Sequence, residues 1–274
     1  MKKALVFDRI KDDHIKNWLQ CLIKYFENKN IEVHTSYGSN YNFHIKYDII
    51  FVWNGQLDIY QPLINHAIKN NIKLLFIECG WFNQKQYYYV DPLGVNQNAS
   101  IMNDNFEWIN QDHIDKLNKF RQRYLDGRKW STPGKYILCP LQIESDTNVI
   151  NNAPYPKMQD FIKHTENKFP NDMVIFKTHP VCPNLNYKVN GNNALVRSGN
   201  FLEMAQDAKV VYGQTSTALL ESTLLGAPTE AMGNCWLNKH KENKEKLLAA
   251  LVEKQIPIGE LNLDYWIGKY VNFS

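Results

Sequence analysis

Two carboxylates and two cationic side chains close apolar runs of this sequence. Glu78 directly ends the run in IKLLFIECG, and Asp146 follows YILCP in a loop, PLQIESD. Lys177 and His179 end the run VIFKTHP and lie on one side of the predicted strand. An unpaired charge at the end of a buried strand is unfavourable unless it has a partner or faces a cleft. One carboxylate from each half of the chain would suit acid–base or covalent chemistry at an anomeric carbon, and the cationic pair would suit a phosphate or carboxylate.

The stretch YGQTSTALLE combines the end of a strand with the start of a helix. Ser216 and Thr217 open this helix, where free backbone N–H groups and the helix dipole favour a phosphate. Glu221 lies one turn beyond Thr217, where its carboxylate could accept hydrogen bonds from ribose hydroxyls. Ordinary explanations stay open for several of these residues. Ser216 or Thr217 could be a simple N-cap, His179 a structural histidine, and Asp146 a solvated turn residue.

Elements that would position these residues alternate along both halves. In the first half, strand-like runs at 4–8, 31–36, 47–53 and 72–80 are interspersed with helical patterns at 13–30 and 60–71. In the second half, runs at 136–142, 173–179, 194–198, 209–213 and 227–233 alternate with helical patterns at 158–169, 216–226 and 243–254. Such alternation predicts βαβ units and parallel sheets. Ligands of these sheets bind beyond the carboxyl ends of the strands, which is where the polar residues fall.

The expected fold class is therefore α/β, with two Rossmann-like parallel-sheet domains facing a cleft, as in glycosyltransferases of the GT-B type. The segment 126–135, DGRKWSTPGK, has the composition of a linker. We expect an N-terminal domain at 1–127, on the acceptor side, and a C-terminal domain at 134–255, on the donor side. A terminal helix at 256–274 could cross back to the first domain. The polar, aromatic segment 81–100 is too long for a simple connection, and its rings could pack either sugar faces or a core.

Composition excludes some classes of function. A net charge of +3, with lysines scattered through helical patterns, does not favour nucleic-acid binding. The five cysteines show no CxxC spacing, which indicates reduced thiols and a cytoplasmic location rather than disulfides or zinc. No apolar stretch approaches the length of a transmembrane helix. The N-terminal run before Asp8 is too short for a signal peptide and is typical of a first strand.

Four motifs taken together resemble the bacterial capsule-synthesis proteins. They are ECGW with DPLGVN (78–96), PLQIESD (140–146), KTHP (177–180) and STALLESTLLGAP (216–228). Within that group the sequence is most similar to the retaining β-Kdo glycosyltransferases, which use CMP-Kdo. Motif order and spacing make the resemblance more specific than any single motif.

The resemblance implies roles for individual residues. Asp146 would be the nucleophile that gives a glycosyl-enzyme intermediate, and Glu78 an acid that handles the proton of the acceptor hydroxyl. The donor-binding set would be Gln142, Lys177, His179, Ser216, Thr217 and Glu221. The expected function is transfer of Kdo, a 2-keto-3-deoxy sugar acid, from CMP-Kdo to a glycan or glycolipid acceptor, with retention. Neither a cofactor nor a metal is expected, since no DXD motif is evident.

Two alternatives stay open at this stage. A CMP-sialic acid or CDP-polyol transferase could share the architecture, and a non-catalytic nucleotide- or glycan-binding module could share the sites. A lipid-linked acceptor would also imply peripheral association with the inner face of the inner membrane.

Overall fold

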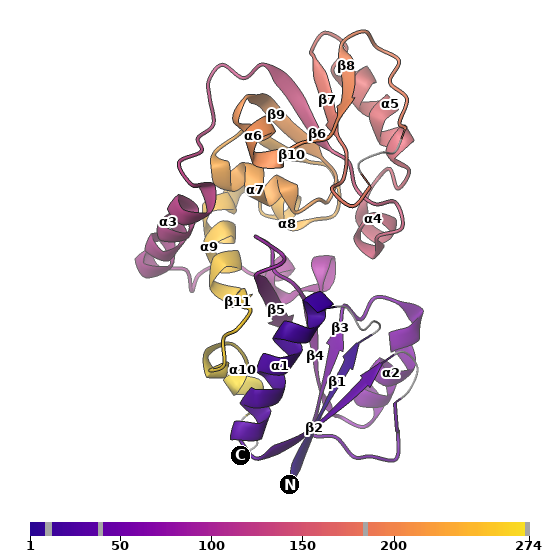
Figure 1. Ribbon diagram of the computed structural model, residues 1–274, viewed down its shortest axis with the longest axis vertical. Helices are drawn as coiled ribbons and strands as arrows, with labels where there is room; N and C mark the ends of the chain where they lie inside the picture. The colour runs from indigo at the N-terminus through magenta and orange to yellow at the C-terminus, as the bar shows by residue number, and fades with distance from the viewer. Residues whose placement is uncertain (9–12, 38–40, 183–185, 272–274) are drawn as a thin grey trace. The chain divides into compact units, whose positions relative to one another are not determined.

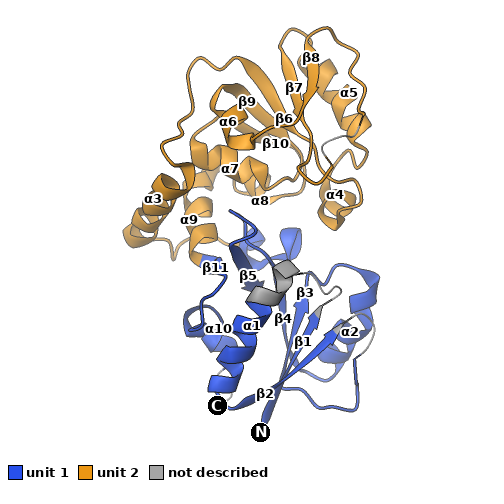
Figure 2. Ribbon diagram, in the orientation of Figure 1, with its two compact units in different colours: residues 1–103, 254–274 blue, residues 104–253 orange. Residues whose placement is uncertain are grey.

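The structure is a computed structural model that describes residues 1–8, 13–37, 41–182 and 186–271. Contacts divide the chain into two compact units (Figures 1 and 2). Unit 1 comprises residues 1–103 and 254–274, and unit 2 comprises residues 104–253. Segment 104–127, which the sequence assigns to the first domain, groups by its contacts with unit 2.

Unit 1 is built on a six-stranded sheet with the order β11-β5-β4-β3-β1-β2. Strands β1 to β4 are parallel, whereas β5 pairs antiparallel with β4 and β11 antiparallel with β5. The strands are β1 (Lys2–Asp8), β2 (Ile31–Tyr37), β3 (Ile49–Trp53), β4 (Lys73–Cys79), β5 (Tyr87–Asp91) and β11 (Ile256–Pro257). The helices are α1 (Asp13–Asn28), α2 (Gln61–Lys69) and α10 (Asp264–Val271), with short 3-10 turns at Asp58–Tyr60, Asn96–Asn98 and Ser100–Asn103.

Alternation along the strands of unit 1 gives each face of its sheet a separate core. Ala4 and Val6 of β1 point to the face covered by α1 and by Ile267 of α10. Leu5 and Phe7 point to the opposite face, and Figure 1 shows α2 on that side. The C-terminal helix α10 therefore completes the core of unit 1.

Unit 2 contains a five-stranded parallel sheet with the order β10-β9-β6-β7-β8. Its strands are β6 (Tyr136–Pro140), β7 (Val174–Lys177), β8 (Ala194–Arg197), β9 (Ala208–Gly213) and β10 (Thr229–Ala231). The helices are α3 (Gln111–Leu125), α4 (Thr147–Asn152), α5 (Met158–Lys168), α6 (Phe201–Gln206), α7 (Ala218–Leu225), α8 (Trp236–Lys239) and α9 (Lys244–Lys254), with a 3-10 turn at Lys241–Asn243. The expected α/β class with two Rossmann-like units is confirmed, and the antiparallel strands of unit 1 are an addition to it.

The second half of the segment interpreted as a linker, residues 130–135, is held by unit 2. The indole N–H of Trp130 donates to the carbonyl of Ala208 over 2.8 Å, and the backbone N–H groups of Ser131 and Lys135 donate to residues 206 and 207. Gly134 lies so close to Lys209 that an added Cβ would be 2.3 Å from its Cα. Residues 130–135 are therefore a packed part of unit 2.

Candidate functional site

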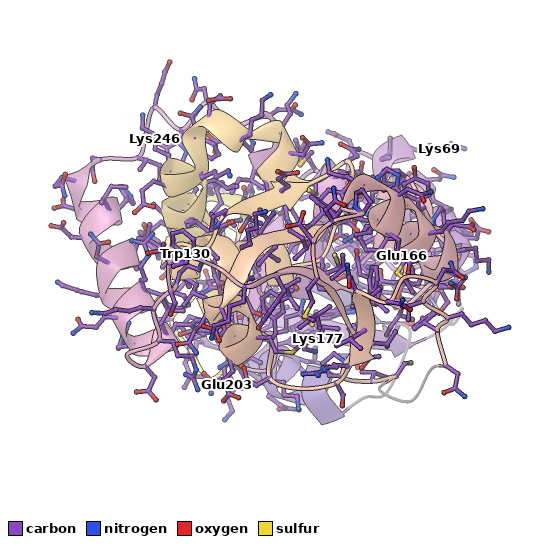
Figure 3. The ribbon with its side chains drawn as sticks, turned by 90° about the horizontal axis from the view of Figure 1, so that it is seen from above. Lys69, Trp130, Glu166, Lys177, Glu203 and Lys246 are labelled. Carbon is purple, nitrogen blue, oxygen red and sulfur yellow. The ribbon has the colours of Figure 1, made fainter. Side chains whose placement is uncertain are left out.

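Lys177 is the last residue of β7, and its side chain is buried although it carries an ammonium group. Its Nζ donates to the carbonyl oxygen of Thr178 over 3.0 Å. Burial lowers the pKa of Lys177, and the charge of Glu221 opposes that shift. Figure 3 shows Lys177 surrounded by other side chains, in contrast to the exposed Lys246. A cation held in this way is unfavourable for folding, which favours a ligand-binding role.

His179 follows two residues later and is half-buried. The backbone N–H of Val181 donates to its Nδ1 over 3.2 Å, so the neutral ring carries its proton on Nε2. Burial and then the charge of Lys177 lower the pKa of His179, while Asp146 raises it. At neutral pH His179 therefore presents a neutral Nε2–H donor.

Gln142, just past β6, and Thr215, just past β9, are buried and bonded to each other. The Gln142 Nε2 donates to the Thr215 Oγ1 over 3.0 Å, and the Thr215 backbone N–H donates to the Gln142 Oε1 over 3.2 Å. The side chain of Asn148 adds a bond to the carbonyl oxygen of Thr215, over 3.1 Å. These bonds brace the loop before α7, so Gln142 has a positioning role here. Its predicted contact with a donor stays a prediction.

The start of α7 has the features of an anion site. The Ser216 hydroxyl accepts a hydrogen bond over 3.2 Å from the backbone N–H of Ala218, the first residue of α7, which is an ordinary structural use of a serine just before a helix. Thr217 makes no capping bond with its side chain. Within the described ranges, the backbone N–H groups of Ser216 and Thr217 donate to no protein atom. Two unused donors at a helix N-terminus are available to a phosphate.

Glu221 lies on the first turn of α7 and accepts a hydrogen bond from the hydroxyl of Tyr124 in α3. Burial raises the pKa of Glu221, and the Tyr124 bond and the Lys177 charge oppose that shift. Sequence reasoning missed Tyr124, because the two residues are 97 positions apart and α3 was assigned to the other domain. It also passed over Thr178, whose buried Oγ1 has no partner among the described residues.

Asp146 is exposed and forms the N-cap of α4. Its Oδ1 accepts from the backbone N–H of Asn148 over 2.8 Å. This is the ordinary structural use of a loop aspartate, although the carboxylate also lies close enough to His179 to raise its pKa. The predicted nucleophilic role stays a prediction.

Glu78 belongs to unit 1, near the end of β4. The Nδ2 of Asn54 donates to its Oε2 over 2.6 Å, and the N–H of Cys79 donates to its Oε1 over 2.9 Å. Asn54 has a left-handed backbone, with φ of 59°, directly after β3. Two neighbouring strands therefore hold the carboxylate in one orientation. Its predicted role with the acceptor proton stays a prediction.

The aromatic segment 81–100 is mostly interior structure. Trp81 stacks on Tyr89 with ring centroids 4.0 Å apart, and both are buried. Asp91 is buried and accepts from the backbone N–H groups of Leu93 and Ser100 and from the Ser100 hydroxyl. These contacts favour the core interpretation of the aromatic residues over a sugar-packing surface.

Within unit 2, the structure brings seven of the eight predicted site residues, all except Glu78, to the carboxyl-end edge of the sheet. Electrostatic coupling links Asp146 to His179, His179 to Lys177, and Lys177 to Glu221. Among the described residues there is no cluster of three or more His, Cys, Asp or Glu side chains that could hold a metal ion. No helix in the described ranges is both long enough and apolar enough to span a bilayer.

This chain matches a protein-family model in sequence and solved structures in fold. Residues 108–240 match the family model of the capsule polysaccharide biosynthesis proteins. The structure is similar to the β-Kdo 2,7 transferase of Thermosulfurimonas dismutans KpsC, with 15% identity, 98% of this chain and 100% of that chain covered, and a TM-score of 0.65. It is also similar to the β-Kdo 2,4 transferase of the same KpsC, with 14% identity, 91% and 89% covered, and a TM-score of 0.67. No curated protein matches at the level of sequence. The expected GT-B-type fold is thereby confirmed.

Proposed function

We propose that this chain, whose residues 108–240 match the family model of the capsule polysaccharide biosynthesis proteins, transfers Kdo from CMP-Kdo to a glycan acceptor. One observation carries the proposal: the buried Lys177 ends β7 and the neutral His179 follows it, inside the family-matched segment. The charge of Glu221 acts on Lys177 from α7, whose start has unused N–H groups. The fold shared with two β-Kdo transferase structures supports this donor over other nucleotide sugars.

Donor binding would use the whole edge of the sheet. The phosphate of CMP would accept from the N–H groups of Ser216 and Thr217, and the Lys177 ammonium would offset its charge. The Nε2–H of His179 would donate to a phosphate or carboxylate oxygen. Glu221 would accept from ribose hydroxyls through the oxygen that Tyr124 does not occupy.

The chemistry would take place in two steps. A carboxylate oxygen of Asp146 would attack the anomeric carbon, the bond from that carbon to the phosphate oxygen would break, and CMP would leave with the electron pair. The acceptor hydroxyl would then attack the same carbon and displace Asp146, while Glu78 takes the hydroxyl proton. Two inversions give net retention. Lys177 would stabilise the charge that develops on the departing phosphate.

A donor panel tests this function. The purified full chain is given CMP-Kdo generated in situ, CMP-sialic acid or CDP-glycerol, and release of the nucleotide is measured with and without glycan acceptors. CMP release from CMP-Kdo alone is the expected result. Turnover of another donor in place of CMP-Kdo would assign the chain to that transferase class. CMP binding without turnover of any donor, across a panel of acceptors, would indicate a binding module.

A further inference from the structure

A second pocket lies in unit 1, at the edge of its sheet. It has a volume of about 340 Å³ and lies between β1, the edge strand β2 and residues 41–47 of the connection to β3. The residues that matter for its chemistry are His34, Ser36, Tyr41, Asn42 and Tyr47. Its volume is at the low end of the range for small-ligand sites, about 300–1,000 Å³, which suits a ligand of monosaccharide size.

The buried hydroxyl of Ser36 is the first observation that favours a ligand in this pocket. Its side chain is only 8% exposed, and its hydroxyl has no hydrogen-bond partner among the described residues. A buried hydroxyl without a partner is unfavourable, and such groups are rare in folded proteins. Because Ser36 lines the pocket, a ligand with hydroxyl groups would supply the missing bond.

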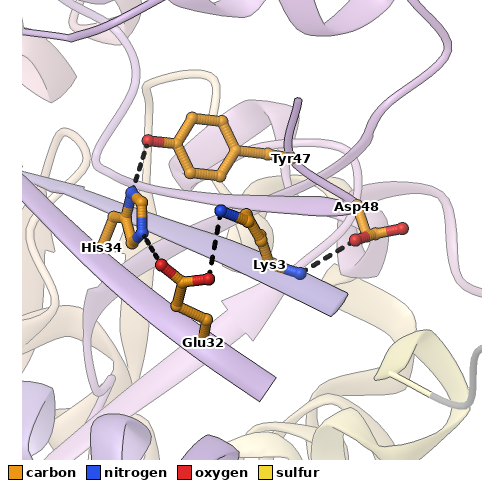
Figure 4. Close-up of polar contacts among 5 residues, drawn as sticks. All are labelled: Lys3, Glu32, His34, Tyr47 and Asp48. Atoms are coloured by element: carbon orange, nitrogen blue, oxygen red, sulfur yellow. Dashed lines mark hydrogen bonds and ion pairs between the residues drawn. The ribbon is translucent and has the colours of Figure 1, made fainter. Parts of the chain in front are cut away.

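A hydrogen-bonded chain fixes the wall of the pocket next to Ser36 (Figure 4). The Nε2 of His34 lies 2.6 Å from the Glu32 Oε1, and its Nδ1 lies 3.1 Å from the Tyr47 hydroxyl. With the carboxylate accepting from Nε2–H, Nδ1 accepts from Tyr47, whose oxygen can still accept from a ligand. Burial and then the Glu32 charge raise the pKa of Tyr47, so the hydroxyl keeps its proton. The polar groups are thus oriented before a ligand arrives.

The charges around the pocket favour a neutral ligand. Among its described lining residues there is no lysine or arginine. The ammonium of Lys3 is paired with the Glu32 Oε2 at 3.1 Å (Figure 4). An anion would therefore meet the Glu32 carboxylate at a described wall that carries no lysine or arginine side chain. The rings of Tyr41 and Tyr47, together with hydroxyl and amide groups, instead match a sugar ring, which has apolar faces and a polar rim.

We propose that this pocket binds a neutral sugar ring and is a glycan-recognition site separate from the candidate active site. Glu78 lies near the end of β4, whereas Ser36 lies on β2, and the order β4-β3-β1-β2 puts three strand spacings between these two strands, about 14 Å. Binding of a neutral sugar does not rest on the proposed transfer of Kdo, although a neutral residue of a glycan acceptor would fit both.

Saturation-transfer NMR on the full chain tests the proposal, with the methyl glycosides of glucose, galactose, mannose, rhamnose and N-acetylglucosamine as probes at millimolar concentration. We expect transfer to at least one neutral glycoside, and weaker or no transfer to free Kdo. Ser36→Ala should weaken binding about 5- to 10-fold, the effect of one lost hydrogen bond. The same variant should fold at least as stably as the wild type, because it removes a buried hydroxyl that has no partner.

Gln20→Ala, an exposed substitution on α1 and so outside the pocket, is the matched control and should leave binding unchanged. Absence of saturation transfer to all five neutral glycosides would overturn the proposal. Equal binding by Ser36→Ala, or a preference for Kdo that depends on Ser36, would overturn it as well. Because the experiment measures sugar binding and not transfer, its result tests this pocket whether or not the chain transfers Kdo.

Discussion

Replacing Lys177 by methionine should make the protein more stable and its nucleotide binding weaker. Lys177 is 5% exposed, and its Nζ donates to one carbonyl oxygen. The Glu221 charge compensates burial only in part, since the pKa of Lys177 is lowered overall. Methionine keeps the buried methylenes and removes the charge. Loss of the bond to Thr178 costs about 1 kcal/mol, and the relief of desolvation exceeds it, for a net gain of about 1–2 kcal/mol.

The gain has a pH dependence of known sign. The folded pKa of Lys177 lies below its ordinary value of 10.5, so the unfolded chain holds this proton more tightly. The unfavourable contribution is complete below the lowered pKa and disappears as the pH rises through 10.5. The advantage of Lys177→Met should therefore shrink as the buffer is made more alkaline.

Two assays measure the two effects. Thermal unfolding at pH 7 should show a melting temperature about 2–8 °C higher for a unit of this size. Calorimetric titration with CMP should show affinity reduced about 10- to 150-fold, which corresponds to one lost charged hydrogen bond of about 1.5–3 kcal/mol. Lys163→Met, at an exposed lysine of α5, is the control and should change neither value much. Unchanged CMP affinity in Lys177→Met would refute the assigned role, and a less stable variant would refute the reasoning on burial.

Three further predictions concern the same edge of the sheet. Glu221→Gln should raise the free energy of unfolding at pH 8. The stability that Glu221 contributes is present below its ordinary pKa and is lost as the pH rises through its raised folded pKa. Urea titrations at pH 4 and pH 8 should therefore show the advantage of the variant only at pH 8. The His179 ring should titrate below 6.5 in an NMR experiment and carry its proton on Nε2, and CMP should raise that pKa; a free-histidine value without CMP would contradict the assignment. Asp146→Ala should destabilise the chain by about 0.5–2 kcal/mol through loss of the α4 cap. Asp146→Asn should keep the cap and lose transfer activity. Equal stability of the two variants in urea would argue against the capping role.

The sequence allowed the parallel strands and the start of α7 to be predicted, because both depend on local patterns. The apolar runs at 72–80 and 173–179 became β4 and β7, and the hydroxyl residues after Gly213 became the start of α7. Lys177 and His179 could be singled out for the same reason, since charge at the end of an apolar run is visible without a structure.

The contacts that decide roles are long-range and could not be predicted in this way. Strand β5 was taken for part of a loop. Its antiparallel partner β4 directly precedes it, but its other partner, the two residues of β11, comes from the far end of the chain. Tyr124 could not be linked to Glu221 from spacing, since only the packing of α3 brings them together. The capping role of Asp146 likewise depends on α4, a six-residue helix that the sequence pattern did not predict.

Transfer of Kdo through Asp146 is tested most directly by intact-protein mass after exposure to CMP-Kdo generated in situ without an acceptor. A covalent aspartyl intermediate predicts CMP release and a Kdo-sized increase in mass on the peptide that contains Asp146, both absent in Asp146→Asn. Full transfer activity in Asp146→Asn, or CMP release to completion from CMP-Kdo with no modified protein at any time, would contradict the covalent route. Release of nucleotide only from a donor other than CMP-Kdo would contradict Kdo transfer itself.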